Sequence, residues 1–455
     1  MSREIKTIPR LKVILGLFRF LKNPIPLIDE ALIEYGDTYI TYLGATTKSF
    51  MSVDPDFTQH ILQKNNKNYH KSKLQTKSVG KYVGQGLLTT NGAYWLKQRR
   101  LIQPGFKKDK IVKLMSLMYE VVEEYVGELK IRLENGPQEI EITEEMSLLT
   151  LRIISKALFS TGIEGEQLEL LNKAVTDLQS AIIKNVRQPM FGWWRKLTGE
   201  DARNDKLSQQ TYDLITKLIE DRRKDAGEYN DLLDMLLHSV YEDTGEGMTT
   251  KQILDEALII FVAGHETTAN ALSWTLYLLD QHPDIAKKLQ AESEAVELDG
   301  PISYADIAKM EYNRQILSES MRLYPPAWIT DRVALEDDVA NGVKINKGDV
   351  IGLYIYGTHH SPKLWDDPEK FDPSRFERDK MKTYHPYAYY PFGGGPRLCI
   401  GQQFAMVEMQ LSLMELVKNF NFKLKEGHPI ELSPLVTLRP AHGLKMVVSN
   451  KDEMH

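Results

Sequence analysis

Seven long stretches of the chain repeat apolar residues at helical spacing, and this periodicity restricts the fold more than any other feature. Strand signals are fewer: a hairpin near 37–54, a hairpin at the Asn341–Gly342 turn, and a last pair from 420–427 and 442–449. The pattern predicts a mainly α-helical chain with small β-sheets. The helical stretches lie at about 108–134, 142–160, 166–187, 205–226, 250–281, 304–323 and 402–418.

Charge and cysteine content exclude several classes of protein. The net charge is −6, with 63 acidic and 57 basic residues, so no bulk positive field indicates a nucleic-acid partner. A single cysteine cannot form an internal disulfide, which favours a reducing, cytoplasmic location.

The N-terminal apolar run does not predict a membrane span. Lys12 and Arg19 interrupt it, and a spanning helix needs about 20 mostly apolar residues. The run could lie on a membrane surface. We expect instead a helix that packs on the core.

The one cysteine, Cys399, stands between a glycine-rich loop and a helical stretch. A helix N-terminus carries partial positive charge and free N–H groups, which predict a lowered thiol pKa and suit a reactive thiolate or a metal ligand. Gly394, Gly395 and Gly401 would let backbone N–H groups approach the sulfur. A buried structural cysteine and a catalytic thiol with a histidine base are the alternatives. A dinucleotide-binding loop fits poorly, because Leu398 stands where the third glycine should be.

Three further patterns are ambiguous alone. Residues 258–279 form a long apolar helix that contains Gly264 and the charged Glu266, which could mark a buried kink or an active site. Glu319 and Arg322 lie three residues apart on one helix, as ordinary surface ion pairs do. Trp95 and Arg99 are spaced as W-x-x-x-R at the start of an amphipathic stretch.

Together these patterns resemble the cytochrome P-450 family. The cysteine loop matches the family's haem-binding signature, F-x-x-G-x-R-x-C-x-G, at Phe392, Gly395, Arg397, Cys399 and Gly401. Four motifs occur in family order between residues 95 and 408. The resemblance implies the cytochrome P-450 fold as a single haem domain over residues 1–455, with a long central distal helix. The Ala-Gly-His-Glu-Thr-Thr form of that helix resembles soluble bacterial fatty-acid hydroxylases and the microsomal-like branch.

The resemblance also assigns roles to residues. Cys399 would ligate the iron of haem b, and Phe392 and Gly401 would frame it. Thr267 and Glu266 would be the alcohol and the acid that deliver protons. Propionate contacts fall to Trp95, Arg99, Arg332 and Arg397, and a structural trio to Glu319, Arg322 and Arg375. The substrate pocket would draw on Phe261, Ala263, Gly264, Trp328, Ile329, Thr330 and Thr437.

The implied activity is monooxygenation of a small organic substrate with O2, by hydroxylation or oxidative O-demethylation. A peroxygenase that uses H2O2 is the second candidate, although the Glu266–Thr267 pair argues against it. A haem sensor or electron carrier is the third. The substrate could be a fatty acid or alkyl chain, or a methoxylated sugar or aromatic ring stacked on Trp328, whose alternative role is simple packing.

Electrons would come from an external partner. A single cysteine cannot hold an iron–sulfur cluster that takes four. We therefore expect a ferredoxin or flavodoxin with its NAD(P)H reductase, steered by a basic patch against the lone acid Asp109. The patch comprises Lys97, Arg99, Arg100, Lys107, Lys108 and Lys110.

Overall fold

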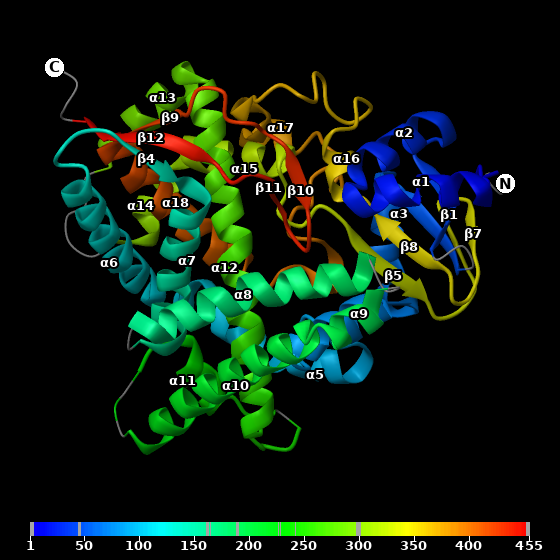
Figure 1. The fold of residues 1–455 in the computed structure, drawn as a ribbon, viewed down its shortest axis with the longest axis horizontal. Helices are drawn as coiled ribbons and strands as arrows, with labels where there is room; N and C mark the ends of the chain where they lie inside the picture. The colour runs from blue at the N-terminus through cyan, green and yellow to red at the C-terminus, as the bar shows by residue number, and fades with distance from the viewer. Residues whose placement is uncertain are drawn as a thin grey trace.

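The structure, a computed structural model, describes every residue except 1–3, 44–46, 161–162, 164, 188–190, 226, 228, 242, 297–301 and 452–455. Figure 1 shows long helices packed around the central helix α12 (Thr250–Gln281), with small separate sheets on either side. The other long helices are α6 (Lys108–Arg132), α7 (Ile142–Phe159), α8 (Gly165–Arg187), α10 (Glu200–Lys224), α15 (Glu311–Leu323) and α18 (Gln402–Asn419).

Helix α12 begins at a capping box, in which Thr249 and Gln252 satisfy each other's backbone N–H groups. It packs on α7, α10, α15 and α18, and most of its side chains are buried because it is apolar on every side. The shorter helices are α1 (Arg10–Lys22), α2 (Ile25–Tyr35), α3 (Pro55–Gln59), α4 (Gly80–Val83), α5 (Gly92–Ile102), α9 (Gly192–Leu197), α11 (Leu232–His238), α13 (Pro283–Glu294), α14 (Tyr304–Lys309), α16 (Ile355–His359) and α17 (Arg378–Met381).

The strands form four small sheets. The largest has the order β1-β2-β8-β5-β3, and a three-stranded sheet has the order β4-β12-β9. Two-stranded sheets join β6 to β7 and β10 to β11. The strands are β1 (Thr38–Leu43), β2 (Thr47–Ser52), β3 (Tyr69–His70), β4 (Gln138–Glu141), β5 (Thr330–Ala334), β6 (Asp338–Ala340), β7 (Val343–Ile345), β8 (Val350–Leu353), β9 (Phe420–Leu424), β10 (Leu432–Pro434), β11 (Leu438–Pro440) and β12 (Lys445–Asn450).

The mainly helical prediction with small sheets is confirmed. The β1–β2 hairpin forms as expected, although its turn at 44–46 lies outside the described residues. Asn341 and Gly342 both have positive φ, at 45° and 76°, as a primed hairpin turn requires. The predicted last pair is β9 with β12. Strand β8, in contrast, leaves β7 and pairs with β2 and β5.

Two expectations about helices were wrong. The stretch 304–323 is divided into α14 and α15, because Met310 leaves the helical conformation at φ −84° and ψ 53°. The N-terminal helix α1 does not bury its apolar face, since only Gly16 is buried there. Leu15 and Phe18 are 75% and 80% exposed. Among the described residues, no helix combines the length and apolar content that a membrane span requires.

Candidate active site

The cysteine loop turns tightly before α18. Cys399 donates its backbone N–H to the carbonyl of Phe392 at 3.0 Å. Gly395 has φ +63°, and a Cβ atom there would lie 1.9 Å from the carbonyl oxygen of Leu62. No other residue fits that position, so the glycine fixes the approach of the loop to the segment around Leu62.

The thiol of Cys399 is both exposed and desolvated. Its side chain is exposed, yet desolvation by the surrounding protein raises its pKa. The Gly401 N–H group and the charge of Arg99 act against this effect and lower the pKa of the thiol. The predicted lowered pKa is therefore wrong for the free thiol, because desolvation outweighs the helix terminus. A metal ion would supply the missing positive charge.

Three cations lie close together beside this loop. Burial lowers the pKa of Lys71, and the charges of Arg332 and Arg397 lower it further. The pKa values of Arg332 and Arg397 each fall to about 10, mainly through desolvation. The neighbouring Asp331 already accepts hydrogen bonds from Ser72 at 2.9 Å and 3.1 Å. Three basic side chains therefore face this one carboxylate, and of the three Arg332 is buried.

Trp95 and Arg99 separate in the structure. Trp95 is buried, and the Arg397 guanidinium lies 4.1 Å from its ring centroid. Arg397 also donates to the carbonyl of Thr90 at 3.1 Å. Arg99 instead donates to the carbonyl of Leu398 at 3.0 Å, next to the cysteine. Trp95 thus joins the cationic cluster through Arg397, whereas Arg99 lies on the cysteine loop.

The middle of α12 has an opening in its packing, where the helix is accessible. Ala263 is exposed and Gly264 and Thr267 are half-buried, although most neighbouring side chains of the helix are buried. The Thr267 hydroxyl donates to the carbonyl of Ala263 at 2.7 Å, which leaves its oxygen lone pairs free to accept. A small-residue stripe in a buried helix gives room for a ligand at this point.

Glu266 belongs to a buried polar network. Its carboxylate lies 2.8 Å from Arg439 and accepts a hydrogen bond from Thr437 at 2.7 Å. Asn270 donates to Thr437 at 3.1 Å. Burial raises the pKa of Glu266, while Arg439 and the two hydrogen-bonding residues lower it. Arg439 is 25% exposed and so connects this acid with the surface.

The other proposed pocket residues divide into two groups. Ile329 and Thr330 are half-buried, and Thr330 accepts a hydrogen bond from Arg332 at 3.2 Å. Phe261 is fully buried in the main core. Trp328 is 6% exposed and donates to the carbonyl of Leu435 at 3.0 Å. Trp328 therefore takes the packing role stated above as its alternative.

The predicted trio of Glu319, Arg322 and Arg375 comes together in the structure. Arg322 contacts Glu319 at 2.7 Å and 2.9 Å, and both side chains are fully buried. Arg375 lies 3.4 Å from the same carboxylate. Arg322 also donates to the carbonyl oxygens of His359 and Lys370, so the trio ties α15 to α16 and to the following loop.

Haem fits the residues described above. Its iron needs a thiolate ligand, and Cys399 presents an accessible sulfur. Its two propionates would match the cluster of basic side chains at Lys71, Arg332 and Arg397. The opening at Ala263 supplies space on α12.

The comparison with protein families decides the identity. The family model of cytochrome P450 matches residues 8–446. The chain belongs to the cytochrome P450 family. It is thus a P450 monooxygenase, and its family implies haem held by a cysteine thiolate.

Relatives of this P450 come from plants and bacteria. LUTEIN DEFICIENT 5, chloroplastic, of Arabidopsis thaliana is 31% identical over 94% of this chain and 74% of its own. A cytokinin hydroxylase of the same plant is 32% identical, with 91% and 82% covered. Cyclooctat-9-en-7-ol 5-monooxygenase of Streptomyces melanosporofaciens is 29% identical, with 86% and 84% covered. The bacterial origin of this P450 stays a prediction.

Sequence reasoning missed two residues of this P450 site. Lys71 completes the cationic cluster, and Arg439 pairs with Glu266. Neither belongs to a motif. A lysine before Ser72 and an arginine on β11 carry no local signal, because Glu266, Arg332 and Arg397 all lie far from them along the chain.

Proposed function

We propose that the protein inserts one oxygen atom of O2 into a small organic substrate, with haem b bound at Cys399 and electrons from a separate redox partner. The accessible sulfur of Cys399, in a loop that carries the haem-binding signature of the family, carries this proposal. When bound, the haem would supply oxygen activation, and the thiolate would donate electron density to it.

The chain's own part in the reaction is to move protons. Thr267 has free lone pairs that can hold a water molecule at the opening of α12. Glu266 is the acid next to it, and Arg439 joins that acid to the surface. General acid assistance of this kind is typically worth about 10²–10⁴-fold in rate. A peroxygenase needs no such route, so the pair favours the O2-dependent reaction.

Exchange of Thr267 tests the reaction. We expect Thr267→Ala to bind haem as the parent does and to consume NAD(P)H, while product per NAD(P)H falls and H2O2 rises. Cys399→Ser should abolish the strongly red-shifted Soret band of the reduced CO complex. A Thr267→Ala variant as tightly coupled as the parent would place proton delivery elsewhere.

The class of substrate is the most specific part of the proposal. One relative is named a cytokinin hydroxylase and another a cyclooctat-9-en-7-ol 5-monooxygenase, which supports hydroxylation here. The buried Trp328 offers no stacking surface for an aromatic methyl ether. Fatty-acid or alkyl hydroxylation is the second candidate. Candidate compounds can be ranked by their low-to-high-spin shift, and demethylation can be recognised by formaldehyde.

The redox partner would dock on the cysteine side. Lys97, Arg100, Lys107, Lys108 and Lys110 are exposed on or beside α5 and α6. Arg99 of the same segment contacts the carbonyl that precedes Cys399. An acidic ferredoxin or flavodoxin attracted to this patch would therefore approach the thiolate side, and a cytoplasmic location would supply such a partner.

A further inference from the structure

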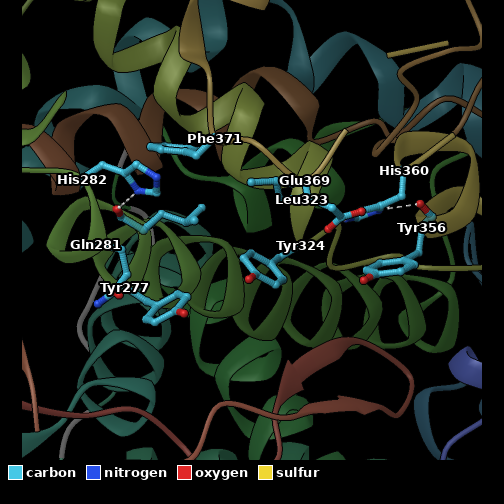
Figure 2. Close-up of a pocket in the computed structure, with 10 residues that line it drawn as sticks. Tyr277, Gln281, His282, Leu323, Tyr324, Tyr356, His360, Glu369 and Phe371 are labelled. Atoms are coloured by element: carbon cyan, nitrogen blue, oxygen red, sulfur yellow. Dashed lines mark hydrogen bonds and ion pairs between the residues drawn. The ribbon is translucent and has the colours of Figure 1, made fainter. Parts of the chain in front are cut away.

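A second hollow lies away from the haem site. It has a volume of about 400 Å³, and Figure 2 shows it between His282 at one end and His360 at the other. Thr267 and Tyr277 are ten residues apart on α12, which is about 15 Å along a helix. The polar and aromatic side chains that line the hollow include Tyr277, His282, Tyr324, Tyr356, His360 and Glu369.

Each histidine of the hollow uses its Nδ1 atom to bond a backbone carbonyl. Nδ1 of His360 lies 2.9 Å from the carbonyl of Tyr356, and Nδ1 of His282 lies 2.8 Å from the carbonyl of Leu278. A carbonyl only accepts, so each Nδ1 must carry the proton. Burial lowers the pKa of His360 to about 4, which keeps its ring neutral at pH 7. Its Nε2 atom is therefore an acceptor.

The Nε2 atom of His360 faces a second acceptor, the carboxylate of Glu369. The Nε2 atom of His360 is 3.8 Å from the carboxylate of Glu369, too far for a hydrogen bond. The charge of Arg322 acts on Glu369, but the Arg322 guanidinium already binds Glu319 and two carbonyl oxygens. Glu369 consequently has no close cation among the described residues. A donor placed between His360 and Glu369 would satisfy both groups.

Aromatic rings complete the hollow. Tyr277, Tyr324 and Tyr356 lie in a row along it (Figure 2), and no hydrogen bond joins their hydroxyl groups to another described residue. One face of Tyr324 stacks on Trp274 and one face of Tyr356 stacks on His360, so a cation could be attracted only to the faces that these contacts leave uncovered. A metal ion is a poor occupant, since no group of three suitable ligands occurs in the described part of the chain.

We propose that this hollow binds a small organic cation rich in N–H donors, an amidinium, guanidinium or ammonium group on a flat or apolar body. The N–H groups would bridge His360 and Glu369, and the body would lie against the tyrosine rings. This site is separate from the proposed function, because none of its residues takes part in haem binding or proton delivery.

Benzamidinium and its neutral counterpart benzamide test the site on the haem-loaded enzyme. Isothermal titration should detect benzamidinium but not benzamide, with an unchanged Soret band. Glu369→Gln should weaken benzamidinium binding about three- to fivefold, the range of an exposed ion pair. Because Glu369 is 77% exposed, this variant keeps the fold.

Glu426→Gln is the matched control, an exposed glutamate removed from the hollow. It changes the net charge equally and should leave the affinity unchanged. The proposal would be overturned if benzamide bound as tightly as benzamidinium, or if Glu369→Gln bound benzamidinium as tightly as the parent. A Soret shift that follows the titration would also overturn it.

Discussion

Glu266 is a carboxylic acid inside a buried helix. The charge of this side chain depends on Arg439, a residue of β11. Arg439 lies 2.8 Å away and lowers the pKa that burial has raised. In Arg439→Gln the glutamine can still donate a hydrogen bond, but the positive charge is lost. The pKa of Glu266 should rise further, so the pH profile of product per NAD(P)H should move to higher pH.

The control for this exchange is Arg378→Gln, a surface arginine that is 77% exposed. It should leave the pH profile in place. An unchanged profile in Arg439→Gln would mean that Glu266 does not limit coupled turnover.

Single residues were predictable from the sequence only where a motif fixed their neighbours. Cys399, Thr267 and the Glu319–Arg322 pair stand in short patterns whose geometry is local. Arg439 and Lys71 act through partners that only tertiary packing brings close, and propensity cannot reveal such contacts. The raised pKa of the Cys399 thiol likewise depends on desolvation by the surrounding protein, which the sequence of the loop does not encode.

At the scale of elements, α15 contains two ion pairs with the same spacing and opposite environments. Glu319 and Arg322 are fully buried, whereas Glu311 and Arg314 are each 32% exposed. Removal of one partner from a buried pair costs about 3–5 kcal/mol. We therefore expect Arg322→Met to lower the free energy of unfolding by about that amount in urea titrations.

Arg314→Met is the internal comparison in the same helix. This pair is only half-buried, although Arg314 also donates to the carbonyl of Phe376 at 2.8 Å, so the variant should lose clearly less stability than Arg322→Met. Similar losses in both variants would contradict a special role for burial in α15.

Element prediction succeeded where periodicity ran unbroken. The apolar repeat of α12 gave both its ends, and a capping box marks its start. The same reasoning merged α14 with α15, because a single buried residue, Met310, interrupts the helix without a proline or glycine. The outward apolar face of α1 was also unpredictable, since periodicity does not say which side faces the core.

At the scale of the whole molecule, the basic patch should steer the redox partner. Exchange of Lys107, Lys108 and Lys110 for Glu should slow reduction at low salt and flatten its salt dependence. The matched variant reverses Lys196, Lys206 and Lys217, which are exposed on α9 and α10. Stopped-flow reduction that slows equally in both variants would reject a specific docking face.

Buried histidines make the protein sensitive to acid. Burial lowers the pKa of His265 to about 4, below the ordinary value of 6.5. Between those values the unfolded chain binds the additional proton, so this stability is present above pH 6.5 and is lost as pH falls toward 4. The raised pKa values of Asp29, about 6, and Glu256, about 7, act in the opposite direction.

A difference measurement isolates the histidine. His265→Gln can still bond with Ser147, which lies 2.8 Å from the ring nitrogen. Its free energy of unfolding should fall less steeply than that of the parent between pH 6.5 and 4. Parallel curves would show that His265 does not titrate in this range.

The accessible sulfur of Cys399 gives the protein a built-in gauge of cofactor loading. The chain has one thiol, and that thiol is also the expected iron ligand. An alkylating reagent can therefore modify each haem-free chain once and each loaded chain not at all. The mass spectrum of a treated preparation would then report the fraction of loaded chains directly, without reference to colour or turnover.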